Sequence, residues 1–266
     1  MSVTVGTVAC DGFTVDYCRF GQGERPLVIL PGLSVQSVLL SADAIEAEYA
    51  VMRDDFTVTV LERRRELPPV YGIADMARDT AAALDALGLR KIGLFGASQG
   101  GMIALELAAS RPDLVSRAAV ASTALNVTGA RFAAVGRWID AARRGDGEAL
   151  CLDFGRTVYP PAVFVSCEET LRRIGRSVTR AELDRFVILA AGTEGYRFTH
   201  TEALQCPLWA AGSKDDAVFG EAALREIAAA FADRPGFSVR EYEGFGHAVY
   251  DTAPDFRDQL HFFFTV

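Results

Sequence analysis

Residues Ile92–Gly101 read IGLFGASQGG, and this stretch decides how the chain folds. The apolar run Ile92–Phe95 is typical of a strand buried on both faces, and Met102–Ala109 has the composition of a helix. Between them stands Gly-x-Ser-x-Gly, a tight turn that forces its serine into a strained backbone conformation and exposes the hydroxyl. The stretch therefore predicts a strand–turn–helix unit that presents Ser98 as a nucleophile.

The residues around Ser98 suit that turn. Gly96 and Gly100 are expected as glycines because a side chain at either position would clash between the strand and the helix. The helix that begins after Ser98 aims its amide dipoles at negative charge developing beside the hydroxyl.

The oxyanion that forms during acyl transfer needs hydrogen-bond donors beside the nucleophile. One is predicted to be the backbone amide of Gln99, the residue just past Ser98. The second is expected from the loop after the first parallel strand, where Pro31–Ser34 follows the apolar run Leu27–Leu30. The amide of Leu33 is the candidate there.

A serine hydroxyl needs a base to take its proton. Of the three histidines, His247 ends the glycine-rich stretch Gly244–His247, which follows the strand-like run Phe237–Tyr242. His200 lies where the chain leaves a helical region, and His261 belongs to the last helix, where a packing or surface role is expected. His247 is the predicted base.

An acid must orient that histidine, and it should follow another strand between the serine and the histidine in chain order. The apolar run Leu208–Ala211 leads to Gly212 and then to two adjacent carboxylates, Asp215 and Asp216. The run Ala118–Ala121 has no carboxylate close behind it, so the acid is predicted after the later run.

Short apolar runs separated by helical stretches recur along the chain and predict an α/β fold. Ile73–Leu87, for example, carries apolar residues at helical spacing. Alternating strands and helices imply right-handed crossovers and a sheet covered on both faces. Near the start, Asp11-Gly12 predicts an antiparallel hairpin of Val3–Val8 and Phe13–Tyr17.

Between residues 123 and 201 this alternation lapses into amphipathic helical stripes. Capping-box patterns that begin at Ser166 and Thr179 predict helix starts inside the region. We interpret residues 123–201 as an all-helical cap, or lid, inserted into a core formed by residues 1–122 and 202–266.

Aromatic and basic side chains are frequent in this insertion. We expect its aromatic residues to lie in the core more often than in a pocket; they are Phe154, Tyr159, Phe164, Phe186 and Tyr196. Its arginines Arg172, Arg173, Arg176 and Arg180 are interpreted as solvated helix faces.

The order of these features resembles the α/β-hydrolase superfamily: a strand with a Pro-Gly loop, a Gly-x-Ser-x-Gly elbow, a helical insertion, Gly-x-x-Asp and Gly-x-Gly-His. The resemblance implies an eight-stranded, mostly parallel sheet flanked by helices, with the cap roofing the active site. The Gly-x-x-Asp spacing falls on Asp215, which is therefore preferred to Asp216 as the acid. Many members have histidine where Pro31 stands, but the oxyanion donors are amides, so this departure removes no donor.

The composition and net charge limit the kinds of partner that we expect for this chain. The 266-residue chain has 50% hydrophobic and 23% charged residues, as folded globular proteins do. A net charge of −8 repels nucleic acid and anionic membranes, so neither is an expected partner. The basic run Arg63–Arg65, flanked by Glu62 and Glu66, is interpreted as a solvated loop without a role.

The chain carries neither the pattern of a signal peptide nor an apolar run of the about 20 residues that a membrane helix needs. Its five cysteines are widely spaced and include no Cys-x-x-Cys pair. We therefore expect a cytoplasmic protein with reduced thiols.

These residues lead us to expect a small-molecule hydrolase that cleaves a carboxylic ester, lactone or thioester through an acyl-enzyme. Ser98 would attack, His247 would carry the proton and Asp215 would orient His247. No metal or other cofactor is expected, because the histidines lack metal-ligand spacing and no phosphate-binding glycine loop is present. The same parts could serve an aminopeptidase, an acyltransferase or a cofactor-free perhydrolase.

The alternative to an enzyme is a ligand sensor or partner-regulating protein with slow or no turnover. The sequence leaves the oligomeric state open.

Overall fold

The computed structural model describes residues 3–266, and its strands form an eight-stranded sheet in the order β1-β2-β4-β3-β5-β6-β7-β8. The pairs β1–β2 and β2–β4 are antiparallel and the other neighbouring pairs are parallel. The predicted α/β fold with a mostly parallel sheet is confirmed, and so is the hairpin that turns at Asp11-Gly12. The strands are β1 Thr4–Cys10, β2 Phe13–Phe20, β3 Arg25–Leu30, β4 Phe56–Leu61, β5 Ile92–Ala97, β6 Val115–Ala121, β7 Leu208–Ser213 and β8 Phe237–Tyr242.

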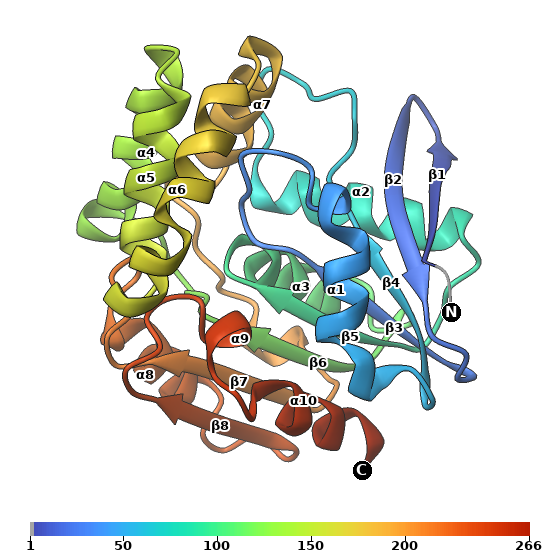
Figure 1. Cartoon of the computed structure of the whole chain (residues 1–266). Coiled ribbons are helices and arrows are strands. Elements are labelled where there is room, and N and C mark those ends of the chain that lie inside the picture. Colours follow the sequence, from blue (N-terminus) through green and yellow to red (C-terminus); the bar gives the residue numbers. More distant parts are fainter. Residues whose placement is uncertain (1–2) are drawn as a thin grey trace.

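Helices cover both faces of this sheet (Figure 1). Alternate residues of a strand point to opposite faces, so Val28 and Leu30 pack in one core with α2, α3 and α8. Leu27 and Ile29 pack in a second core with α1, α9 and α10. These helices are α1 Ala42–Glu48, α2 Ile73–Ala86, α3 Gln99–Ser110, α8 Glu221–Ala230, α9 Val249–Thr252 and α10 Phe256–Thr265.

Four further helices lie between β6 and β7 in the chain and are gathered together beside the sheet in Figure 1. They are α4 Ala133–Arg143, α5 Gly147–Val158, α6 Pro161–Ser177 and α7 Arg180–Ala191. Helix α6 packs on α5, and α7 packs on α4. Within residues 123–201, all of which the structure describes, the strand-type pairing is one isolated bridge between Asn126 and Arg197. The action of these four helices as a lid stays a prediction.

Of the two predicted helix starts in this region, one is confirmed and the other is wrong. Thr179 caps α7, because its hydroxyl accepts a hydrogen bond from the amide of Glu182 at 3.2 Å, and that prediction is confirmed. The predicted start at Ser166 is wrong. Ser166 lies inside α6, which begins at Pro161, and its hydroxyl donates to the carbonyl of Val163 at 2.7 Å.

Short 3-10 turns complete the described elements: Val38–Ser41, Ala50–Met52, Gly129–Phe132 and Thr201–Ala203. Among residues 3–266, no helix has both the length and the apolar character needed to cross a bilayer.

Candidate active site

Ser98 occupies the sharp turn between β5 and α3 in a strained backbone conformation, with φ of 52° and ψ of −117°. A non-glycine residue is rarely found there, and surrounding contacts must hold it in place. The amide of Ser98 donates to the carbonyl of Ala121 at 2.8 Å, and the hydroxyl of Thr123 donates to the carbonyl of Ser98 at 2.8 Å. These bonds tie the turn to the neighbouring strand and the segment after it.

Glycines make this turn possible. A Cβ at Gly96 would collide with the carbonyl of Gly100, and a Cβ at Gly100 would collide with the carbonyl of Leu30. Both are the positions at which the sequence pattern predicts crowding between strand and helix.

His247 brings the catalytic candidates together. Its Nε2 lies 2.9 Å from the Oγ of Ser98, and its Nδ1 lies 2.9 Å from Oδ2 of Asp216. An ionised carboxylate can only accept hydrogen bonds, so Nδ1 carries the proton toward Asp216 and Nε2 is free to accept the proton of Ser98. His247 is only 2% exposed, which shields this chain of contacts from water.

Asp216 is held as a carboxylate. Its Oδ1 accepts hydrogen bonds from the amides of Val218 at 2.7 Å and Phe219 at 3.0 Å. Burial by itself raises the pKa of this carboxyl, but its electrostatic interaction and hydrogen bond with His247 and the hydrogen bonds from the two amides outweigh burial. Together they hold the pKa of Asp216 below its ordinary value.

The prediction that Asp215 orients His247 is wrong, because the acid in contact is its neighbour Asp216. Strand β7 continues through Ser213, two residues beyond the predicted run Leu208–Ala211, and Asp215 then faces the loop before the histidine. Its carboxylate accepts from the amides of Gly244 at 2.8 Å and Gly246 at 2.9 Å, and from the hydroxyl of Ser213. Asp215 thus fastens the loop that carries His247.

The other two histidines lie apart from Ser98. His200 is exposed and meets the ring of Phe198 edge-on. The Nε2 of His261 lies 2.8 Å from a carboxylate oxygen of Asp55.

The loop after β3 lies against the nucleophile. A Cβ at Gly32 would stand 3.3 Å from the Cβ of Ser98, so the segment from Pro31 to Leu33 borders the hydroxyl. Gln99 is the first residue of α3, where an amide has no acceptor within its own helix. Both backbone segments chosen from the sequence therefore lie beside Ser98.

A mainly apolar cavity of about 460 Å³ opens beside this loop. Gly32, Ala97 and Tyr250 place it next to Ser98, and α5 and α6 contribute further walls. Of the five aromatic residues considered in the insertion, Phe154 and Tyr159 line the cavity, whereas Phe164, Phe186 and Tyr196 are buried in the protein core.

The arginines of α6 and α7 named above face carboxylates or solvent. Arg172 and Arg176 both pair with Glu148, and Arg180 pairs with Asp184.

The interpretation of Arg63–Arg65 as one solvated loop is wrong for Arg63, whose side chain is buried. Arg64 is half-buried and pairs with Asp79, and only Arg65 is exposed, paired with Asp16. The sequence offers one signal in retrospect: Arg63 stands only two residues beyond the end of β4, a strand that is buried along almost its whole length.

Comparison with known proteins agrees with this architecture. The family model described as alpha/beta hydrolase fold matches residues 13–163. Among solved structures, MGS-M2, an alpha/beta hydrolase enzyme from a Medee basin deep-sea metagenome library, superposes with a TM-score of 0.84 at 18% identity, over 99% of this chain and 98% of that one. The enol-lactonase of Burkholderia xenovorans LB400 superposes with a TM-score of 0.83 at 18% identity, over 98% of this chain and 100% of that one. At this identity the two structures show the fold alone.

A sequence relative matches over a shorter stretch. RutD of Klebsiella pneumoniae (strain 342), named as a candidate carbamate hydrolase, is 38% identical over 73 residues. That stretch is 27% of this chain and 27% of the relative, so the match spans about a quarter of the relative's length.

Proposed function

Because this chain belongs to the alpha/beta hydrolase fold family, we propose that it is a serine hydrolase that cleaves a carboxylic ester, lactone or thioester of an uncharged, largely apolar small molecule. The observation that carries the proposal is the pair of 2.9 Å contacts that link Ser98 to His247 and His247 to Asp216. They join a nucleophile, a base and an orienting acid, the set that acyl transfer by serine requires.

In the proposed reaction, His247 accepts the Ser98 proton through Nε2 while Oγ attacks the substrate carbonyl carbon. The carbonyl oxygen becomes negative and is held by the amides of Leu33 and Gln99. His247, oriented by Asp216, then gives its proton to the leaving oxygen or sulfur, and an acyl-enzyme remains. Water attacks this acyl-enzyme with His247 again as the base, the bond between the acyl group and Oγ breaks, His247 returns the proton to Oγ, and the carboxylic acid leaves.

The cavity beside Ser98 supports an apolar substrate. Its walls include Leu33, Val35, Phe154 and Ile174, and its volume of about 460 Å³ is in the range of small-molecule sites. A carbamate carbonyl, the group named for the Klebsiella relative, is open to the same attack and belongs in a substrate screen.

A fluorophosphonate probe tests the nucleophile. We expect one equivalent to label the wild-type protein at Ser98, and Ser98→Ala to abolish the labelling, because a serine reacts with the probe only when a base activates it. Ser122 is the matched control: it is a buried serine with φ of 50° at the end of β6, and Ser122→Ala should retain labelling. Stoichiometric labelling of Ser98→Ala would refute the assignment.

Sustained hydrolysis of p-nitrophenyl esters separates an enzyme from a ligand sensor. An enzyme should complete many cycles per labelled site, whereas a sensor should stop after a few slow ones.

A further inference from the structure

Arg63 is a buried cation at the rim of the site. It follows β4 by two residues, and its side chain is 5% exposed. Among residues 3–266, no carboxylate oxygen lies within 4.0 Å of its guanidinium nitrogens, and its Nε has no hydrogen-bond partner. Burial lowers the pKa of Arg63 to about 10, so the side chain still carries its positive charge at neutral pH. A buried charge with no carboxylate in direct contact is unfavourable for folding, which indicates a role beyond packing.

The hydrogen bonds of Arg63 reach both segments that border the nucleophile. Its Nη2 donates to the carbonyl of Pro31 at 2.6 Å and to Oε1 of Gln99 at 3.3 Å. Pro31 begins the loop that carries the amide of Leu33, and Gln99 carries the other proposed oxyanion donor. One guanidinium therefore bridges the two halves of the proposed oxyanion hole.

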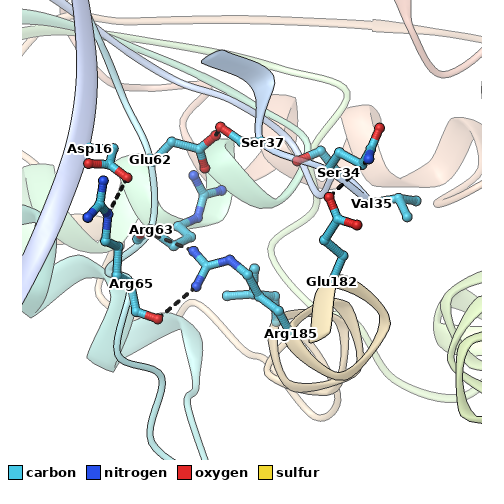
Figure 2. A pocket seen from close by; sticks show the side chains of 11 residues that line it. Asp16, Ser34, Val35, Ser37, Glu62, Arg63, Arg65, Glu182 and Arg185 are labelled. Carbon is cyan, nitrogen blue, oxygen red and sulfur yellow. Dashed lines mark hydrogen bonds and ion pairs between the residues drawn. The ribbon is translucent and has the colours of Figure 1, made fainter. Parts of the chain in front are cut away.

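Helix α7 fixes the position of Arg63 from the other side. Arg185 donates to the carbonyl of Arg63 at 3.0 Å and to that of Arg64 at 2.8 Å. Nε2 of Gln99 donates to the carbonyl of Leu189, also on α7, at 2.7 Å. Figure 2 shows Arg63 and Arg185 side by side between the end of β4 and α7.

The small cavity around Arg63 does not favour a bound anion. Its three arginines, Arg63, Arg65 and Arg185, are matched by three carboxylates, those of Asp16, Glu62 and Glu182 (Figure 2). Since these charges balance, the cavity would not attract a free anion, and the interactions of Arg63 with the backbone carry the inference.

We propose that Arg63 is a positioning residue for the oxyanion hole: it holds the Pro31–Leu33 segment and Gln99 at a fixed separation, so that the amides of Leu33 and Gln99 stay aimed at the negative oxygen that forms between them. This inference rests on the proposed function. Donors held in fixed positions stabilise the negative oxygen of the transition state more than the neutral substrate. The loss of Arg63 should therefore lower kcat and leave KM almost unchanged.

The test compares Arg63→Met, which keeps an unbranched stem but removes the charge and the donors, with Arg63→Lys, which keeps the charge. The control is Arg65→Met, which removes an exposed arginine of the same run. Three quantities are measured: kcat per active site and KM for p-nitrophenyl butyrate, and the second-order rate constant of fluorophosphonate labelling at Ser98. The labelling reaction also builds negative charge on an oxygen, and it requires no knowledge of the natural substrate.

For Arg63→Met we expect both kcat and the labelling rate constant to fall by about 10², with KM within about threefold of wild type. Arg63→Lys should regain about tenfold of this loss, and Arg65→Met should match wild type. A purely structural role would reduce the number of active sites without changing the rate at each, so it is distinguished by the titration with the probe.

The inference is overturned if Arg63→Met labels and turns over at the wild-type rate per site, or if the loss appears only in KM. If Arg63→Met does not fold, as judged by circular dichroism, Arg63→Gln and Arg63→Lys carry the same comparison. Failure of the proposed function looks different, because wild-type protein would then not be labelled at Ser98 at all.

Discussion

The adjacent residues Asp215 and Asp216 both hold His247 in place, but through different contacts. Asp216 is buried and contacts the imidazole ring, whereas Asp215 is exposed and accepts hydrogen bonds from the backbone of the loop before it. The two side chains leave the same turn in different directions, so substitution of each should have a different consequence.

We expect Asp216→Asn to lower kcat by about 10⁴, because an amide can donate to Nδ1 and stabilise the wrong tautomer of His247. Asp215→Asn should keep kcat within about tenfold of wild type while lowering the melting temperature, since an amide replaces only part of its bonds to Gly244 and Gly246. Steady-state kinetics and thermal unfolding of both variants make the comparison. A larger loss of kcat in Asp215→Asn would contradict the geometry found here.

The segment that leads from β6 to α4 is fastened to helix α8. Glu226 of α8 accepts from Nδ2 of Asn126 at 2.9 Å and from Nη1 of Arg131 at 2.7 Å. The hydrogen bonds of Arg131 hold the pKa of Glu226 below its ordinary value. This contact joins two elements far apart in sequence, so it should stabilise the tertiary structure more than a pair within one helix.

We expect Glu226→Gln to lower the melting temperature by about 1–3 °C at pH 7, because the 42% exposed side chain is screened and contributes about 0.5–1 kcal/mol. A lowered pKa means that this stabilisation is complete above the unfolded value of about 4.3 and is lost as pH falls through the folded value. The difference from wild type should thus be constant from about pH 6 to 8 and shrink below about pH 4.

Glu221→Gln provides the control for that experiment. Glu221 pairs with Arg225 inside α8, one turn away, and both are surface residues. Thermal scans across pH should show a smaller effect for this variant. A pH-independent difference for Glu226→Gln would contradict the assigned origin of the stabilisation.

At the scale of the whole molecule, the cavity beside Ser98 lies where the helical insertion meets the carboxyl ends of the strands. Gly32 and Ala97 come from the sheet side, and Phe154 and Ile174 come from α5 and α6. Phe154 packs against Trp138 of α4 in a tilted arrangement, with ring centroids 4.6 Å and ring planes 43° apart, which fixes that wall. Neither the sheet side nor the helical insertion encloses the cavity alone, so substrate selectivity should depend on both.

We expect kcat/KM for p-nitrophenyl esters to rise by up to about fourfold per added methylene until the cavity is full, since each buried methylene contributes about 0.8 kcal/mol. Phe154→Ala should reduce the ratio of the hexanoate to the acetate value by at least about threefold. Val165→Ala, at a 70% exposed position on α6, is the control and should leave the ratio unchanged. An equal ratio in wild type and Phe154→Ala would remove this residue from the substrate site.

Local sequence was enough to predict the sheet, the elbow and His247. Strands buried on both faces require continuous apolar runs, and a turn as tight as that around Ser98 admits only glycine at Gly96 and Gly100. Such requirements act over a few residues, so they can be read from a short window of the chain. The Thr179 capping box is of the same kind, because its two partners are three residues apart.

Only the tertiary structure decided which aspartate meets His247, which arginine is buried and which aromatic rings line the cavity. Asp215 and Asp216 are chemically identical, and the end of β7 and the loop before His247 set their directions. Arg63 is buried because α7, more than a hundred residues later, covers it. Contacts between distant segments depend on the packed shape of the whole chain, and a local pattern carries no information about which segment will arrive from elsewhere.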